Sequence, residues 1–596
     1  MCGIVACQTT QPALDFLMAG LRRLEYRGYD SAGVAVRTHD GDVVRLRSVG
    51  RLAALEGELS GYQGAELAGG GIGHTRWATH GSVSTDNSHP HIDCLGEVNV
   101  VHNGIIENAD ELRSELTLRG HTFRTEVDSE VVAHLVEEAL AGGADLADAV
   151  DKATSALVGS WALAVVRPGE GPVVLTARRS PLVVASGCGG TYAASDLTAL
   201  AGWADSFQVV DDGDLVLLSR EGISWRRADG STSAPVLRTL SMTGEQAERG
   251  SAPDFMAKEI SQQTSTTQSV VSRLGDGIAD GSLWRDLDLP PLQRVRFSAC
   301  GTSLNAAHVL GRLLAVHGVP STLAHASELD GLVMEPGAVT VALSQSGETA
   351  DVLRSLDGLR DGTPVLALTN VGTSTLGRSA QAVVELGVGP EIGVAATKTF
   401  TAQVVTGVSV LLSGLVYARR ISTTQARVLV ELLHEVPSLI EEADALARAH
   451  CPAVASAVRT APGFLFVGRG SGVPYAAEGA LKLKELTYRW AECQPAGELK
   501  HGPIALIESG TPVVVVDDGH PKLRGNVAEI NARCATVLDV GGPGSALPYR
   551  SGSPEAVPWG PLASVVVMQH LARELAIVLG RDVDKPRNLA KSVTVE

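Results

Sequence analysis

Cys2 directly follows the initiator Met1 in the run Met1-Cys2-Gly3-Ile4-Val5. A small second residue permits removal of Met1, which leaves Cys2 with a free α-amino group beside its own thiol. An α-amino group titrates near pH ~8, against ~10.4 for lysine, so its neutral form can accept the thiol proton. The pattern predicts an N-terminal nucleophile, although many proteins begin with Met-Cys and have no such role for the cysteine.

Three more segments of the first half carry polar side chains that could hold a substrate. Residues 73–81 place Arg76 and two histidines behind a predicted strand; a solvated loop is the alternative. Asn103 and Gly104 follow another predicted strand and offer an amide and an N–H to one oxyanion, unless they form a simple Asn-Gly turn. Asp128 precedes a predicted helix, where it could bind an ammonium group or cap the helix.

In the second half, residues 343–349 read Leu-Ser-Gln-Ser-Gly-Glu-Thr between a predicted strand and a predicted helix. Hydroxyl groups and a glycine N–H at a helix N-terminus can bind an anion. The segment has no lysine, which excludes a nucleotide P-loop and favours a sugar phosphate. An ordinary serine-rich helix cap is the alternative.

Lys482 and Glu485 lie three residues apart in the predicted helix 480–486 and therefore share one face. A carboxylate base beside a cation suits proton movement between adjacent sugar carbons, whereas a surface ion pair is the simpler interpretation. His501 lies in a glycine-bounded loop. Lys591 lies in a weakly charged tail that we expect to be packed, and a buried lysine can form a Schiff base with a ketone.

The elements that position these residues differ between the two halves. The first 240 residues predict many short strands, few helices and a mixed sheet. The strands are expected at 31–36, 43–48, 71–77, 97–101, 161–166, 173–177 and 215–218, and the helices at 12–24 and 128–140.

After the polar segment 241–251, strand–turn–helix patterns repeat, as in a doubly wound parallel sheet. A strand at 295–299 precedes a Gly-Thr-Ser turn and a helix from about residue 305. A strand at 464–467 precedes a glycine-rich turn and a helix from about residue 476. Strands at 339–343 and 512–516 follow, so we interpret the half as two copies of one α/β module; two unrelated domains are the alternative.

Composition narrows the class of protein. The 596 residues are too many for one core, and the net charge of −18 argues against nucleic acid or an anionic membrane as the main partner. The eight cysteines form no CxxC pair, which predicts neither a zinc site nor a disulfide framework and fits a reducing cytosol. No signal peptide pattern begins the chain, and the apolar stretch 404–418 is interpreted as a buried helix too short to span a membrane.

Together, Cys2, Arg76, the Asn103-Gly104 pair and Asp128 resemble the glutaminase domain of the class II glutamine amidotransferases. Residues 26–33, Tyr-Arg-Gly-Tyr-Asp-Ser-Ala-Gly, and the motifs of the second half resemble the glutamine–fructose-6-phosphate aminotransferases, and the likeness extends to Glu596. It implies an α+β N-terminal-nucleophile domain, an αββα sandwich, followed by two α/β doubly wound sugar isomerase (SIS) domains. The expected bounds are 2–240 for the glutaminase domain, 241–284 for the linker and first helix, 285–425 and 426–585 for the SIS domains, and 586–596 for the tail.

The same resemblance implies a role for each motif residue. Cys2 would attack the amide of L-glutamine, with Asn103 and Gly104 as oxyanion donors. Glutamine would be bound by Arg76, Trp77, Thr79, His80 and Asp128. The phosphate of D-fructose 6-phosphate would be bound by Thr302, Ser303, Ser344, Gln345, Ser346 and Thr349. Glu485 would shuttle a proton with support from Lys482, His501 would assist ring opening from a neighbouring subunit, and Lys591 would form a Schiff base.

Further expectations from the resemblance are a cytoplasmic homodimer or higher homo-oligomer that needs no metal or organic cofactor. Three residues depart from the family pattern: Ala6, Ala396 and Trp490 stand where glycine, serine and histidine are usual. A housekeeping enzyme or a paralogue of specialised metabolism, with an altered sugar or inhibitor response, would both fit these changes. We expect Trp490 to reshape either the sugar pocket or a subunit contact.

Three other functions were weighed against this one. Amidophosphoribosyl transfer and asparagine synthesis share the N-terminal domain, but the first needs a phosphoribosyl pyrophosphate site and the second an ATP-binding Ser-Gly-Gly-x-Asp loop. Residues 241–596 contain neither pattern. A non-catalytic regulator that binds sugar phosphates would have no use for Cys2, Glu485 or Lys591.

Overall fold

The computed structural model describes residues 2–187, 189–232, 234–240, 242–329, 337–359 and 362–594. The chain forms two compact units, the first made of Met1–Gly250 with Ala590–Glu596 and the second of Ser251–Leu589. Met1, whose removal we expect, and Cys188 lie outside the described residues.

The first unit contains two antiparallel sheets. The eight-stranded sheet has the order β14-β11-β9-β10-β1-β4-β2-β3, and the six-stranded sheet has the order β13-β12-β8-β7-β6-β5. The strands are β1 (Gly3–Thr9), β2 (Ser31–Thr38), β3 (Val43–Val49), β4 (Leu67–Arg76), β5 (His91–Ile92), β6 (Asn99–Ile106), β7 (Gly159–Val166), β8 (Val173–Arg178), β9 (Val183–Gly187), β10 (Gly190–Ala194), β11 (Ser206–Val209), β12 (Leu215–Leu218), β13 (Ile223–Arg226) and β14 (Arg238–Thr239).

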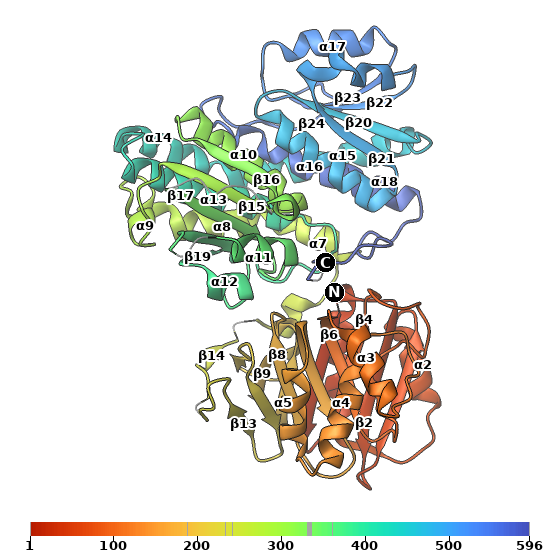
Figure 1. The fold of residues 1–596 in the computed structure, drawn as a ribbon. Helices are drawn as coiled ribbons and strands as arrows, with labels where there is room; N and C mark the ends of the chain where they lie inside the picture. Colours follow the sequence, from red (N-terminus) through yellow and green to blue (C-terminus); the bar gives the residue numbers. More distant parts are fainter. Residues whose placement is uncertain are drawn as a thin grey trace. The chain divides into compact units, whose positions relative to one another are not determined.

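Helices cover the outer faces of the two sheets, as Figure 1 shows for the first unit. They are α1 (Ala13–Leu24), α2 (Leu52–Gly61), α3 (Ala109–Leu118), α4 (Glu130–Ala141), α5 (Leu146–Ser155) and α6 (Leu197–Leu200). Alternate side chains of strand β1 pack into two different cores, which places its sheet between a layer of helices and the second sheet. Ile4 and Ala6 pack between the sheets, whereas Val5 and Cys7 pack against the helices. The expected αββα sandwich is therefore confirmed.

Most strands expected in the first half occur within a few residues of their predicted bounds. The prediction of few helices was wrong, because α2, α3 and α5 were not foreseen. In α2 only Leu52 and Leu55 are buried, so its apolar pattern is weak. The departure at Ala6 is accommodated without exposure, since this residue is fully buried in β1.

The second unit contains two five-stranded parallel sheets with matching strand order, β16-β15-β17-β18-β19 and β21-β20-β22-β23-β24. This shared order bears out the interpretation of a duplicated α/β module. The strands are β15 (Arg294–Ala299), β16 (Ser321–His325), β17 (Ala338–Ser344), β18 (Val365–Thr369), β19 (Ala382–Glu385), β20 (Gly463–Gly468), β21 (Trp490–Pro495), β22 (Pro512–Val516), β23 (Thr536–Gly541) and β24 (Leu547–Pro548).

One large apolar core joins most of the helices that pack on these two sheets, and two smaller clusters hold the others. The helices are α7 (Phe255–Ser261), α8 (Gln263–Leu274), α9 (Ser282–Arg285), α10 (Gly301–Val316), α11 (Ala350–Asp357), α12 (Thr375–Ser379), α13 (Lys398–Tyr417), α14 (Thr423–His434), α15 (Val436–Ala457), α16 (Gly472–Thr487), α17 (Leu523–Asn531) and α18 (Ser564–Val578). Helix α10 of the first module contacts α16 of the second. Both helices begin four residues before their predicted starts. The Gly-Thr-Ser segment that we expected to be a turn forms the first turn of α10, and α16 begins at Gly472, the last residue of the expected glycine-rich turn.

Two helices of the described residues, Lys398–Tyr417 and Gly560–Val578, are long and apolar enough to cross a membrane. The most apolar window of the first is entirely buried inside the fold, and that of the second is 83% buried. The prediction of a buried helix at 404–418 is confirmed, whereas its expected length was too short. Length and apolar character cannot by themselves separate a core helix from a spanning one.

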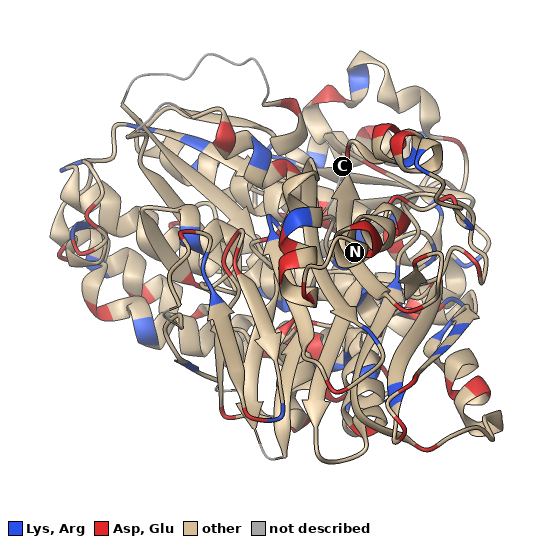
Figure 2. Ribbon diagram, turned by 60° about the horizontal axis from the view of Figure 1, so that its bottom comes forward, with Lys and Arg blue, Asp and Glu red and all other residues tan. Residues whose placement is uncertain are grey.

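Charged residues occur on elements of both units. Figure 2 shows lysine and arginine interspersed with aspartate and glutamate along the described ribbons. Some form surface ion pairs, such as Arg226 with Asp148 at 2.8 Å and Lys500 with Glu529 at 2.8 Å. Exposed pairs of this kind contribute little to stability, at most about 1 kcal/mol each.

Candidate functional site

The pairing of two strands sets the position of Cys2, the candidate nucleophile. Strand β1 runs antiparallel to β4 with Gly3 opposite Thr75, which brings Cys2 next to Trp77. The Trp77 N–H lies 3.3 Å from the Cys2 sulfur. Burial raises the pKa of the Cys2 thiol, while the Trp77 N–H and the charge of Arg76 act to lower it. A nearby base is therefore needed to form the thiolate at neutral pH.

Asn103 lies beside this cysteine and is held by a buried histidine. Its Nδ2 donates to the Cys2 carbonyl at 3.0 Å, and its Oδ1 lies 3.1 Å from His74 Nε2. Burial lowers the pKa of His74 to about 3, so the ring is neutral at pH 7. His74 Nε2 is also 3.0 Å from the His102 carbonyl, and only a protonated Nε2 can donate to both oxygens. This bond turns the amide NH2 of Asn103 toward Cys2.

Gly104 occupies a position that no other residue could take. Its φ is 136°, and a Cβ atom there would lie 2.0 Å from the Ser160 carbonyl oxygen. Both Asn103 and Gly104 lie inside β6, so our placement of them after a strand was wrong, as was the alternative of an Asn-Gly turn. The Asn103 amide thus reaches Cys2 from strand β6 rather than from a loop.

Asp128 and Arg76 offer opposite charges near the same site. Asp128 is buried, and its Oδ2 accepts the Ile106 N–H of β6 at 2.9 Å. The structure assigns the N-cap of α4 to Ser129, so the helix-cap alternative for Asp128 was wrong. Arg76 donates to the His80 carbonyl at 2.5 Å and thereby folds residues 77–82 around its guanidinium. Thr79 and His80 are exposed in that segment, and Trp77 is half-buried.

In the second unit, the serine-rich segment lies between β17 and α11, as predicted. The hydroxyls of Ser344 and Thr349 are 2.8 Å apart, and Ser344 Oγ accepts the Gly347 N–H at 3.0 Å. Ser346 accepts the Glu348 N–H at 3.1 Å, and Gln345 is half-buried. This segment follows the carboxyl end of a parallel strand, where α/β sheets bind ligands.

The ion pair on α16 is buried rather than superficial. Lys482 Nζ lies 2.6 Å from Glu485 and 3.5 Å from Glu478. Burial opposes the charge of Lys482, but the two carboxylates outweigh it and raise the pKa of the lysine. Lys482 is buried and Glu485 half-buried, so the surface-pair alternative was wrong.

The sequence reasoning missed Glu478, which links the two modules of the unit. Its carboxylate accepts Thr302 Oγ1 at 3.0 Å and Asn305 Nδ2 at 2.8 Å, both from α10. Burial raises the pKa of Glu478 to about 7, the range of a working general acid or base. The sequence spacing could have revealed Glu478, because it precedes Lys482 by one helical turn and therefore lies on the same helix face. Ser303, beside Thr302, accepts Gln403 Nε2 at 2.9 Å.

Two further expected site residues, His501 and Lys591, come from other segments of the chain. His501 is exposed at the end of the short 3-10 helix Ala496–His501, and Lys591 is half-buried in the tail that groups with the first unit. Trp490 is 82% exposed at the amino end of β21. The expectation that it reshapes the sugar pocket is therefore wrong for this chain, since ligands bind at the opposite strand ends. A role in a subunit contact stays a prediction.

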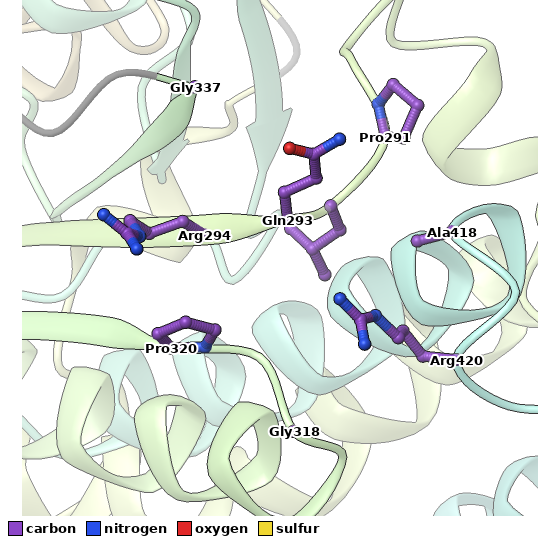
Figure 3. A pocket seen from close by; sticks show the side chains of 9 residues that line it. Pro291, Gln293, Arg294, Gly318, Pro320, Gly337, Ala418 and Arg420 are labelled. Carbon is purple, nitrogen blue, oxygen red and sulfur yellow. The ribbon is translucent and has the colours of Figure 1, made fainter.

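A cavity of about 580 Å³ lies at the amino ends of β15–β17 (Figure 3). Arg294, Arg420 and Gln293 line it together with prolines and glycines. The serine-rich segment lies at the carboxyl end of β17, so this cavity is separate from the candidate sugar-phosphate site. None of the residues that line the cavity is a candidate residue of the sugar-phosphate site.

Comparison with known proteins gives the families of the two units. A family model described as the glutamine amidotransferase domain matches residues 74–202, and one described as the SIS domain matches residues 291–413 and 459–536. The chain is 41% identical to an isomerizing glutamine–fructose-6-phosphate aminotransferase of Thermus thermophilus, over all of both chains. The chain belongs to the glutamine–fructose-6-phosphate aminotransferase family. Relatives of the same name in Caulobacter vibrioides and Streptomyces coelicolor are each 40% identical over their full lengths.

Among solved structures, the C-terminal domain of glucosamine-fructose-6-phosphate aminotransferase from Francisella tularensis is similar to this chain. It is 30% identical with a TM-score of 0.51, and the match covers 57% of this chain and 100% of that one. The two SIS modules of the second unit therefore have the fold of this aminotransferase family, and the unit that precedes them is its glutamine amidotransferase part.

Proposed function

We propose that this protein transfers the amide nitrogen of L-glutamine to D-fructose 6-phosphate, giving D-glucosamine 6-phosphate and L-glutamate. The observation that carries the proposal is the joint presence of two sites in one chain. Cys2 stands within reach of the Asn103 amide in one unit, and Glu478, Lys482 and Glu485 form a buried acid–base cluster in the other.

In the first site, Cys2 attacks the side-chain amide carbon of glutamine, and its own α-amine takes the thiol proton once Met1 is removed. Asn103 and the Gly104 N–H stabilise the oxyanion. Arg76 and Asp128 bind the α-carboxylate and α-ammonium groups, while Trp77, Thr79 and His80 belong to the segment that covers the substrate. Ammonia leaves, and water hydrolyses the glutamyl thioester to glutamate.

In the second site, the hydroxyl-rich groups bind the sugar phosphate: Thr302, Ser303, Ser344, Gln345, Ser346 and Thr349. Glu485 moves a proton between C1 and C2 of the open-chain sugar, and the ammonium group of Lys482 supports its charge. Glu478 has a pKa near neutrality and contacts Lys482, so it can hold or release a second proton.

The remaining assignments complete this proposal. Lys591 forms a Schiff base with the ketose at C2 and releases water, and ammonia from the first site then displaces the lysine from C2. His501 assists ring opening from a neighbouring subunit, and the protein works as a homodimer or higher homo-oligomer in the cytoplasm. We further propose functional domains at 2–240, 285–425 and 426–585, with 241–284 as linker and first helix and 586–596 as the tail.

The decisive experiment incubates the purified protein with glutamine carrying 15N in its amide and with a panel of ketose phosphates. Product masses are then determined. We expect 15N in glucosamine 6-phosphate and stoichiometric glutamate. Turnover of another sugar with fructose 6-phosphate inert would instead identify a specialised paralogue.

Cys2→Ala should abolish the glutamine-dependent reaction while the protein still binds fructose 6-phosphate, because the sugar-binding groups lie in the other unit. Cys534→Ala is the matched control, since Cys534 is an exposed cysteine of the second unit. Full glutamine-dependent synthesis by Cys2→Ala would overturn the proposal.

A further inference from the structure

Four side chains outside the glutamine site converge on one point in the first unit. Cys94, His121, His134 and Glu137 each direct one ligand atom into a group in which all four atoms lie within 4.8 Å of one another. The Cys94 sulfur is 3.5 Å from Nδ1 of either histidine. Glu137 Oε2 is 3.0 Å from His121 Nδ1 and 3.1 Å from His134 Nδ1.

These separations suit a tetrahedral metal ion. With metal–ligand bonds of about 2.0 Å to nitrogen or oxygen and 2.3 Å to sulfur, the edges of a tetrahedron measure roughly 3.3–3.6 Å. The observed contacts lie within a few tenths of an ångström of that range. One thiolate, two imidazoles and one carboxylate are all ligands of the kinds that zinc binds.

A second carboxylate lies near the Nε2 atom of each histidine, on the side of the ring away from the cluster. His121 Nε2 lies 3.2 Å from Glu138, and His134 Nε2 lies 3.6 Å from Glu130. The Glu138 carboxylate at Nε2 of His121 favours the ring proton there and leaves the Nδ1 lone pair facing the cluster.

We propose that Cys94, His121, His134 and Glu137 bind a zinc ion in a closed structural site. Four protein ligands leave no position for a reacting water, which distinguishes a structural from a catalytic zinc site. Binding converts the Cys94 thiol to a thiolate and releases its proton to solvent. The charges of thiolate and carboxylate then balance those of Zn²⁺, and both imidazoles stay neutral.

The position of the cluster would let the ion hold three segments of the chain together. Cys94 lies between β5 and β6, His121 between α3 and α4, and His134 and Glu137 on α4 itself, so one ion would fasten three segments. Residues 124–125, which follow His121 in the chain, are also held against α4, because Glu130 of that helix accepts their N–H groups at 2.8 and 2.9 Å. That segment leads directly into Asp128 of the glutamine site.

No CxxC pair marks this site in the sequence, because Cys94 lies 27 residues from His121, the nearest of the other three ligands. The proposal revises the expectation that the protein needs no metal. It rests on the cluster alone and is independent of the reaction that the protein catalyses.

The test uses the full-length protein without a histidine tag. Mass spectrometry of the dialysed protein should find one zinc per chain, and Co²⁺ added after chelation should give a thiolate-to-cobalt charge-transfer band with the visible spectrum of a tetrahedral ion. Cys94→Ser should abolish that band, whereas Cys534→Ser, at an exposed cysteine, should keep it. Glu138→Gln should weaken zinc binding about 10- to 100-fold through the loss of an outer carboxylate.

A second readout avoids variants that fail to fold. Zinc should protect Cys94 of the unmodified sequence from alkylation, and chelation should remove that protection, while alkylation of Cys534 stays constant. The absence of a charge-transfer band in the parent protein, or equal alkylation of Cys94 with and without zinc, would overturn the proposal in favour of an ion-pair cluster of protonated histidines.

Discussion

Replacing Asn103 with alanine tests whether its amide stabilises the oxyanion. Its Nδ2 lies 3.0 Å from the Cys2 carbonyl and is held there by His74. Removal of one oxyanion donor costs about 2.7–4 kcal/mol in the transition state, which lowers kcat roughly 10²- to 10³-fold. Arg76 and Asp128 are untouched, so KM for glutamine should stay nearly unchanged, as for an interaction made only in the transition state.

The assay measures glutamate release over a range of glutamine concentrations, and circular dichroism verifies that the variant is folded. Asn108→Ala is the matched control. This asparagine also bonds backbone groups, with Nδ2 donating to Ala156 at 2.9 Å and Oδ1 accepting from Val158 at 3.0 Å. The reasoning is refuted if Asn103→Ala keeps the kcat of Asn108→Ala, or if only its KM rises.

Three further predictions follow from the same contacts. Gly104→Ala should abolish glutamate release and lower the melting temperature, because its Cβ would meet the Ser160 carbonyl at 2.0 Å. The pKa of Glu478 is raised from 4.5 to about 7, so between these pH values the folded state keeps a proton that the unfolded state loses. The free energy of unfolding should therefore fall as pH rises from 4.5 to 7. Denaturant titrations of Glu478→Gln should show a weaker dependence of this free energy on pH. The pKa of His74 falls from 6.5 to about 3, so only the unfolded state binds a proton at this residue as pH falls below 6.5, and the first unit should become less stable. Hydrogen exchange in β4 should then be faster than intrinsic exchange rates explain. The His74→Gln variant should show a smaller effect.

The sequence predicted elements best where a local pattern agrees with the environment in the fold. Strand β12 at Leu215–Leu218 and strand β22 at Pro512–Val516 have their predicted bounds, because short runs of apolar residues fit buried strands whatever surrounds them. Helix α2 was missed because most of it faces solvent and its apolar spacing is weak. The starts of α10 and α16 were placed too late because glycine and serine favour turns locally, whereas packing between the modules extends both helices.

Sequence alone determined which side chains carry the proposed chemistry at Cys2, in the serine-rich segment and at Lys482 and Glu485, since each motif is contiguous or lies one helical turn apart. Tertiary structure decided what those side chains contact. It placed Asn103 beside Cys2 from another strand, Glu478 between two modules, and Cys94 beside three ligands from distant segments. The physical reason is that the geometry and titration of a buried polar group depend on neighbours that only the folded chain assembles.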